Sequence, residues 1–244
     1  MRDGREVRAD CSQTFVYCTW NAYSHRAEGQ PTLERVDAIE KLRTLVGVDL
    51  RQLADKYQVT VWKGEKKNKG WAGHTLERFL GLPINSAQSP NFGSWELKQV
   101  QLVPRRDGML RVKETMAITM IDPYNVAAKP FEESHLLAKL QKIVVVARVF
   151  ESQLDARSLL HSVAEFDLSD SGIYQQVKAD YESVRQTIIN DGFGALTGAM
   201  GVMIQPRTKG PGHGSVSRAF YARTSFVAHI LGSGYHIPLP VEIK

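Results

Sequence analysis

A carboxylate and an amine lie two residues apart near the start of the segment from Trp95 to Val103, as Glu96 and Lys98. The segment has the composition of a β-strand, and side chains two apart on a strand share a face. Glu96 and Lys98 are therefore predicted to point the same way. A carboxylate can hold a divalent cation, while an amine steadies an attacking hydroxide and the charge that grows on a phosphate. The pair suits metal-assisted cleavage of a phosphodiester.

Two further oxygen-bearing side chains lie upstream, one on a helix and one in a turn. The segment from Trp71 to Leu82 is predicted to be a helix, because its apolar residues recur at helical spacing and Gly81 suits a helix end. Glu77 lies beside its apolar face. Asn91 belongs to a Pro-Asn-Phe-Gly turn before the strand. A Glu-x-Lys pair alone is weak evidence, because such pairs arise by chance, so these neighbours matter.

The order and spacing of these residues resemble the MutH-like family of PD-(D/E)XK endonucleases, which includes a strand-nicking mismatch-repair enzyme and related type II restriction enzymes. The matching runs are Lys69-Gly70-Trp71-Ala72-Gly73, Leu76-Glu77, Leu80-Gly81 and Glu96-Leu97-Lys98. A Ser-His-x-x-x-Lys-Leu helix ending at Leu140 continues the resemblance, which extends from near Leu42 to Leu231. The family's catalytic set maps onto Glu77, Asn91, Glu96, Lys98 and Lys139, with Glu77, Asn91 and Glu96 as the implied ligands of Mg²⁺.

Position 91 departs from the family pattern, because an aspartate is expected there and the chain has Asn91. A carboxylate brings a full negative charge to a hard cation, whereas an amide offers one neutral oxygen. Metal affinity and catalysis should both be much lower with the amide. Two interpretations follow. The chain is either an inactive Asp-to-Asn form of a natural enzyme, which we favour because the other catalytic residues remain, or a diverged relative that binds without cutting well.

Two basic segments are candidates for contact with DNA. Lysines are dense between Lys63 and Lys69, where they form either a solvated loop or an arm that contacts phosphates. A Gly- and Pro-rich loop follows an apolar strand near Met203 and supplies donors for phosphates and base edges. The resemblance places the family's base-reading loop and a Phe-Tyr segment here. The residues predicted to bind DNA are Lys69, Gln205, Arg207, Lys209 and Tyr221.

Periodicity and turn signals predict the elements that position these residues. Val36, Ile39, Leu42 and Leu45 recur at helical spacing before Gly47, and Asp49 is a capping residue for a second helix. Asp107-Gly108 is a hairpin signal, and residues 151–172 are predicted to be irregular. The predicted elements are helices over 36–45, 50–57, 71–82, 133–140 and 173–191, and strands over 95–103, 109–121 and 143–150.

Composition limits the class of protein. The chain has 244 residues, of which 43% are hydrophobic, and a formal net charge of +5. This is enough apolar material for one folded unit, and the basic balance favours a polyanionic partner. Cys11 and Cys18 have no second pair to complete a metal site. The charged amino terminus is unlike a secretory signal and no apolar run reaches about 20 residues, so we expect a cytoplasmic protein without membrane contact.

The resemblance implies an α/β fold of the restriction-endonuclease type, with a mixed, largely antiparallel sheet flanked by helices and room for two lobes around a DNA cleft. We expect a single nuclease unit over 1–244. Within it, residues 1–30 are unassigned, 31–150 form the catalytic core, and 173–231 form a helix followed by the DNA-recognition segment.

The leading functional hypothesis is a Mg²⁺-dependent type II restriction endonuclease that acts on double-stranded DNA. A MutH-type strand-nicking repair endonuclease is the first alternative, and a non-catalytic, sequence-specific DNA-binding module is the second. A basic globular protein unrelated to DNA would require the ordered motifs to be accidental. Restriction implies a cognate DNA methyltransferase in the cell, whereas repair implies mismatch-repair activator proteins. Both a monomer and a homodimer are compatible with the sequence.

Overall fold

The fold is described from a computed structural model, for residues 33–81, 93–210, 216–232 and 237–238. The chain divides into two compact units, Met1–Pro31 and Thr32–Lys244, and only the second contains described residues. Both cysteines and Asn91 lie outside the described residues.

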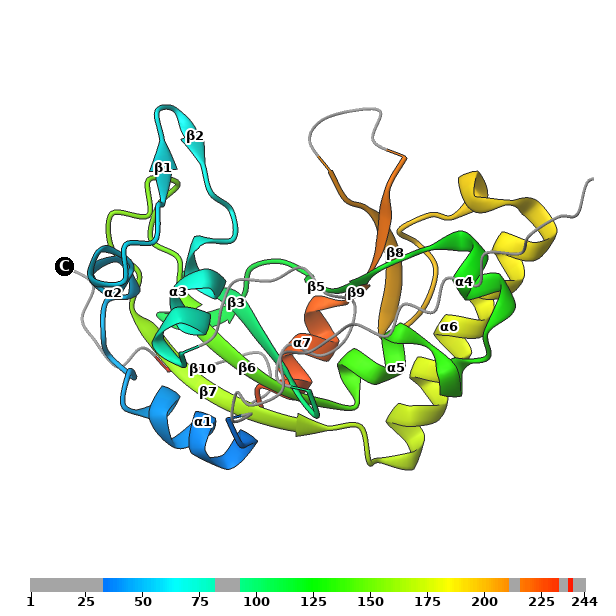
Figure 1. Cartoon of the computed structure of the whole chain (residues 1–244), viewed down its shortest axis with the longest axis horizontal. Coiled ribbons are helices and arrows are strands. Elements are labelled where there is room, and N and C mark those ends of the chain that lie inside the picture. The colour runs from blue at the N-terminus through cyan, green and yellow to red at the C-terminus, as the bar shows by residue number, and fades with distance from the viewer. Residues whose placement is uncertain (1–32, 82–92, 211–215, 233–236, 239–244) are drawn as a thin grey trace, which may run out of the picture. The chain divides into compact units, whose positions relative to one another are not determined.

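A five-stranded mixed sheet with the strand order β10-β4-β3-β6-β7 forms the centre of the second unit (Figure 1). Strand β3 (Glu96–Pro104) runs parallel to β6 (Lys142–Val149). All the other neighbouring pairs are antiparallel. The remaining strands are β4 (Met109–Val112), β7 (Leu160–Asp167) and β10 (Ile237–Pro238). The predicted α/β class, with a mixed and largely antiparallel sheet, is confirmed.

Three helices pack against one face of this sheet. They are α1 (Arg35–Arg43), α2 (Leu50–Lys56) and α3 (Trp71–Phe79). Their apolar residues form one buried cluster with Leu97 of β3 and with Val144 and Val146 of β6. Alternate residues of β6 therefore point to this face, as expected for a strand. Between α2 and α3 lies a two-stranded hairpin of β1 (Trp62–Lys63) and β2 (Lys66–Lys67).

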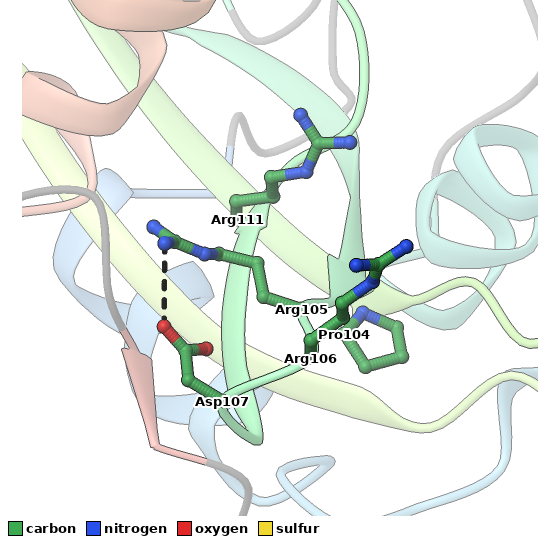
Figure 2. A pocket seen from close by; sticks show the side chains of 5 residues that line it. All are labelled: Pro104, Arg105, Arg106, Asp107 and Arg111. Atoms are coloured by element: carbon green, nitrogen blue, oxygen red, sulfur yellow. Dashed lines mark ion pairs between the residues drawn. The ribbon is translucent and has the colours of Figure 1, made fainter.

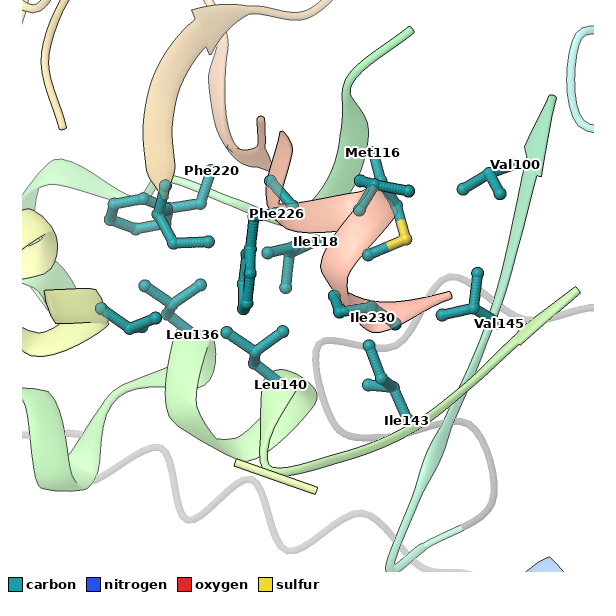
Figure 3. Close-up of a cluster of buried hydrophobic side chains, with 14 of the residues drawn as sticks. Val100, Met116, Ile118, Leu136, Leu140, Ile143, Val145, Phe220, Phe226 and Ile230 are labelled. Carbon is teal, nitrogen blue, oxygen red and sulfur yellow. The ribbon is translucent and has the colours of Figure 1, made fainter. Parts of the chain in front are cut away.

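The opposite face of the sheet packs against a larger apolar cluster. Val100, Ile143 and Val145 contribute from the sheet, and Leu140 and Phe226 contribute from helices (Figure 3). A three-stranded antiparallel sheet, ordered β5-β9-β8, adds to this side. The elements here are α4 (Pro123–Ala128), α5 (His135–Leu140), α6 (Ser171–Asp191), α7 (Thr224–Ile230), β5 (Met116–Met120), β8 (Ile204–Thr208) and β9 (Arg218–Ala222), with short 3₁₀ turns at Phe131–Glu133 and Phe193–Ala195.

Local signals predicted several element ends correctly. The side chain of Asp49 accepts a hydrogen bond of 2.9 Å from the Arg51 amide at the start of α2. Gly47 and Gly108 adopt positive φ angles after α1 and in the β3–β4 turn. Ser134 caps α5 through a 3.1 Å bond from the Leu137 amide. Helix α6 ends at Asp191, one residue before a glycine, as predicted.

Three expectations were wrong. The strand predicted over 109–121 is two strands, because β4 pairs with β3 while β5 pairs with β9 in the second sheet. Residues 151–172 are not irregular, because they contain β7, which pairs with β6 although all its residues after Leu160 stay partly or fully exposed. Val36 is 66% exposed and does not join the buried face of α1. Within the described residues, no helix is long and apolar enough to cross a membrane.

Candidate active site

Two lysines converge on one carboxylate oxygen at the start of β3. Lys98 Nζ donates to Glu96 Oε1 at 2.7 Å, and Lys139 Nζ donates to the same oxygen at 3.3 Å. The side chains are nearly buried, with 2% of Glu96, 16% of Lys98 and 8% of Lys139 exposed. Three charged groups from β3 and α5 therefore form one desolvated cluster.

Strand register explains why these residues meet. Glu96 pairs with Ile143 at the start of β6, and α5 ends three residues before Ile143. Lys139, in the last turn of α5, therefore lies beside the start of β3. Lys98 follows Glu96 by two residues on the same face of the strand. Its Nζ also donates to the carbonyl oxygen of Ile118 on β5 at 3.1 Å, which fixes the amine from a second element.

Glu77 brings a second carboxylate to the cluster from α3. Burial, followed by the negative charge of Glu96, raises the pKa of Glu77 to about 7. The positive charges of Lys98 and Lys139 oppose this rise. The interaction of Glu77 with these three groups places it at the same site. Two carboxylates that repel each other in a desolvated position make a location where a cation is favoured.

Burial lowers the pKa of Lys98, and the positive charges of Lys139 and Lys209 act in the same direction. The charge of Glu96 and its hydrogen bond favour the ammonium form and oppose this decrease. Lys98 thus releases its proton more readily than a solvated lysine does. Lys209, which follows β8, is the smallest of these influences on the pKa of Lys98.

The residues present fit a hard divalent cation. Glu77 and Glu96 supply oxygen ligands, and such ligands suit Mg²⁺ and similar ions. Within the described ranges, no group of three or more His, Cys, Asp or Glu side chains could hold a metal ion. The third predicted ligand, Asn91, falls in the gap between residues 81 and 93, which lies outside those ranges. The described part of the site is therefore a pair of carboxylates rather than a full ligand set.

A buried aspartate that the sequence did not single out holds α3 in place. Asp155 is 0% exposed, and it accepts a 3.0 Å hydrogen bond from Trp71 Nε1 at the start of α3. It also receives Lys67 Nζ at 2.6 Å and Arg148 Nη1 at 3.2 Å. The sequence signal that could have revealed a buried acidic residue such as Asp155 was Arg148, because a charged residue inside an apolar strand requires a buried partner.

The predicted DNA-binding residues differ in their exposure. Lys69, Arg207 and Lys209 are exposed, and Tyr221 is half-buried. Gln205 is only 4% exposed, and its predicted role in DNA recognition stays a prediction. Gln205 and Arg207 lie two apart on β8 and share a face, on which both approach Gly198, but Gln205 is buried within the strand whereas Arg207 near its end is exposed.

The start of β8 is fixed by two charged side chains. Asp180 on α6 accepts hydrogen bonds from the amides of Val202, Met203 and Ile204 at 2.9, 2.7 and 2.8 Å. Arg223 contacts four carbonyl oxygens just upstream, those of Gly198, Ala199, Met200 and Gly201 at 3.0–3.2 Å. The segment that leads into β8 is therefore anchored through both its backbone donors and its backbone acceptors.

Comparison of the sequence with known families identifies the class of this chain. A family model described as "DNA mismatch repair enzyme MutH" matches residues 80–170. That stretch contains β3, α5 and β6, and with them Glu96, Lys98 and Lys139, while Glu77 lies just before it. Together with the relatives described next, the match confirms the predicted resemblance to the MutH-like family of PD-(D/E)XK endonucleases.

Several curated relatives resemble the chain over most of its length. "DNA mismatch repair protein MutH" of Vibrio parahaemolyticus is 24% identical over 213 residues, which cover 82% of this chain and 93% of the relative. The proteins of that name from Shewanella sp. (strain MR-4) and Haemophilus influenzae are 25% and 23% identical and are covered over 93% and 95% of their length. Among solved structures, a "Restriction endonuclease MvaI-cognate DNA substrate complex" is 14% identical to this chain, with a TM-score of 0.32. The alignment covers 74% of this chain and 95% of that one, and a likeness this distant shows nothing further about this chain.

Proposed function

We propose that the chain is a divalent-metal-dependent endonuclease that cleaves double-stranded DNA at the site formed by Glu77 and Glu96. The observation that supports this most is the contact of Lys98 and Lys139 with one oxygen of Glu96, with Glu77 close by. Buried carboxylates and amines together can hold a cation and neutralise the charge that develops on a phosphate.

The roles that we propose follow from the positions of the side chains. A bound divalent cation would supply positive charge to a phosphate and make a nearby water easier to deprotonate. Glu77 and Glu96 would hold that cation together with a carboxylate at position 91. Lys98 would orient the attacking water by a hydrogen bond, and Lys139 would add positive charge beside the scissile phosphate. We propose Mg²⁺ as the natural ion, because every ligand is oxygen.

We propose that DNA reaches the site along exposed cations from two segments. Lys69 lies two residues before the start of α3, the helix that carries Glu77. Arg207 and Lys209 are exposed on and after β8, and Lys209 influences the pKa of Lys98 from there. Clustered cations of this kind bind the phosphates of a duplex without reading its sequence. Tyr221 pairs with Gln205 across β8 and β9 and is proposed to contribute to target recognition.

The test of the proposed function restores the carboxylate at position 91. The Asn91→Asp variant should cut a sequence-diverse plasmid in the presence of Mg²⁺, whereas the unmodified chain should cut it slowly or not at all. The matched control is the double variant Asn91→Asp/Glu96→Gln, which keeps the restored residue and removes the central carboxylate. An intact plasmid with the single variant under Mg²⁺, Mn²⁺ and Co²⁺ would show that the proposed nuclease function is wrong.

Within this function, the type II restriction endonuclease is our first candidate. The repair proteins from Vibrio, Shewanella and Haemophilus are all 23–25% identical to this chain, so it is equally distant from each of them. The resemblance to these proteins is therefore at the level of motifs, and on that ground we keep restriction as the first candidate. Double-strand cleavage at a fixed site by the Asn91→Asp variant alone would support restriction, with a cognate methyltransferase as the cellular partner.

The second candidate is a strand-nicking repair endonuclease. It is favoured by the name shared by these relatives and by the 93–95% of their length that the match covers. Nicking of only the unmethylated strand, and stimulation by a mismatch-repair activator, would support this role over restriction. Tight sequence-selective binding by both the unmodified chain and Asn91→Asp, with cleavage by neither, would instead indicate a non-catalytic DNA reader.

A further inference from the structure

Unfilled space lies near both ends of β3. At the far end is a cavity of about 810 Å³, lined by Pro104, Arg105, Arg106, Asp107 and Arg111 (Figure 2). Arg111 pairs with Val103, which lies on the face of β3 opposite to Glu96, so this cavity faces away from the candidate active site. The space at the near end lies beside α3, the helix that carries Glu77.

Helix α3 has a glycine on the same side as Glu77. Gly73 precedes Glu77 by four residues, so the two positions share a helix face and lie about 6 Å apart along the axis. A β-carbon built at Gly73 would meet nothing within 4 Å, and no positive φ requires glycine there. Glycine inside a helix is less favourable than alanine. Nothing in the described part of the chain therefore accounts for the missing side chain.

The other glycine at this end of α3 differs, because the chain itself explains it. A β-carbon at Gly70 would lie 3.1 Å from Cε1 and 3.2 Å from Nε2 of His74, which packs against that position. Gly70 is also the residue that precedes the first turn of α3. Of these two glycines, only Gly73 presents its bare backbone to unfilled space.

The unfilled space at Gly73 lies where the substrate of the proposed reaction would approach. A long side chain on a helix leans back toward the N-terminus, so the side chain of Glu77 runs over the turn that begins at Gly73. The proposed reaction brings a phosphate close to the carboxylate of Glu77, and the sugars that flank this phosphate extend beyond it. A side chain at position 73 would compete with them for the same space.

We propose that the cleaved strand of the duplex runs directly over the α3 backbone at Gly73, and that the missing side chain admits its sugar–phosphate chain to Glu77. This inference rests on the proposed function. Gly73 is a determinant of substrate access and not a catalytic residue, because it acts only through the space that it leaves open. A larger side chain should exclude DNA according to its size while the fold and both carboxylates stay in place.

The experiment compares Gly73→Ala and Gly73→Leu in the Asn91→Asp background. Gly73→Ala should raise the melting temperature by about 2 °C, because alanine is the better helix former. The affinity for short duplexes prepared from a sequence-diverse plasmid should nevertheless fall about twofold with alanine and at least about tenfold with leucine, because the added atoms overfill a close contact. The rate of plasmid cleavage should fall in the same order.

The matched controls are Gly194→Ala and Gly194→Leu. Gly194 is exposed in the 3₁₀ turn at Phe193–Ala195, and a β-carbon there would also meet nothing within 4 Å. Both controls should keep the DNA affinity of the Asn91→Asp chain. Equal affinities for Gly73→Leu and Gly194→Leu would overturn the inference. An unchanged affinity for Gly73→Ala would overturn it too, if leucine at position 73 lowers the melting temperature.

The rise in melting temperature on addition of Mg²⁺, measured without DNA, separates blocked access from a damaged metal site. Gly73→Leu should keep the rise shown by the Asn91→Asp chain, because Glu77 and Glu96 are unchanged. Loss of this rise would show that the side chain acts on the carboxylates, and the inference would be wrong. If the Asn91→Asp chain itself neither binds nor cuts the duplexes, the proposed function fails instead.

Discussion

Trp71 and Asp155 are joined by a buried hydrogen bond of 3.0 Å from the indole nitrogen to the carboxylate. Trp71 is the first residue of α3, and Glu77 lies on the same helix. Arg148 lies over the Trp71 ring at 5.0 Å and pairs with Asp155 at 3.2 Å. The position of the Glu77 carboxylate therefore depends on an aspartate that has no contact with the candidate site.

Removing the Asp155 carboxylate should destabilise the fold strongly. Asp155→Ala leaves Arg148, which is 1% exposed, as a buried charge with its carboxylate partner lost. Breaking such a pair costs about 3–5 kcal/mol in free energy of unfolding. Urea denaturation measures this loss. The control is Asp55→Ala, which removes an exposed i,i+4 partner of Arg51 and should cost about 0.3–0.5 kcal/mol. Equal losses would show that Asp155 is not a structural anchor.

The same aspartate should make stability depend on acid pH. Burial opposes its charged form, but hydrogen bonds from Lys67 and Trp71 and the charge of Arg148 together hold the pKa of Asp155 below its ordinary value of 3.8. A lowered folded-state pKa contributes stability above pH 3.8, and this contribution is lost as the pH falls through the folded value. The difference in unfolding free energy between the unmodified chain and Asp155→Asn should therefore shrink between pH 6 and pH 3. A difference that stays constant over that range would contradict the assignment.

Local patterns in the sequence were sufficient to predict the elements that carry the candidate site. Glu96 and Lys98 were placed on one strand face by their spacing, and Ser134 marked the start of the helix that carries Lys139. These signals act within a few residues. The contact between Lys139 and Glu96 spans 43 positions, and it was reached only through family resemblance.

Features that depend on distant partners were missed. Strand β7 is partly or fully exposed after Leu160 and is defined by its pairing with β6 rather than by an apolar run. Asp155 bonds to Trp71 across 84 positions, so no local pattern identifies it. Gln205 was selected because it lies beside a basic loop, but it is only 4% exposed, whereas Arg207 on the same face nearer the strand end is exposed, and no local pattern distinguishes the two.

Divalent metal should stabilise the chain once position 91 carries a carboxylate. In the Asn91→Asp background, Mg²⁺ at about 100 times its dissociation constant should add about 2.7 kcal/mol to the unfolding free energy, because a ligand bound only to the folded state stabilises it by mass action. The added substitution Glu96→Gln should abolish this shift. The control is Glu40→Gln, which changes an exposed glutamate on α1 and should leave the stabilisation by Mg²⁺ unchanged. A metal-dependent melting shift that survives Glu96→Gln would place the cation elsewhere.

Gly201 should tolerate no side chain, because it lies between Arg223 and Asp180 at the start of β8. Its φ is +74°, and a Cβ there would lie 1.8 Å from the carbonyl oxygen of Ile204. Gly201→Ala must therefore displace the backbone segment that Asp180 anchors, and the expected loss in free energy of unfolding is above about 4 kcal/mol. Gly47→Ala is the matched control, because φ is +83° there but the added Cβ meets nothing within 4 Å. Only the left-handed backbone conformation is then unfavourable, and the expected loss in free energy of unfolding is about 1–2 kcal/mol. Equal losses by urea denaturation would show that the close approach at Gly201 relaxes without effect on β8.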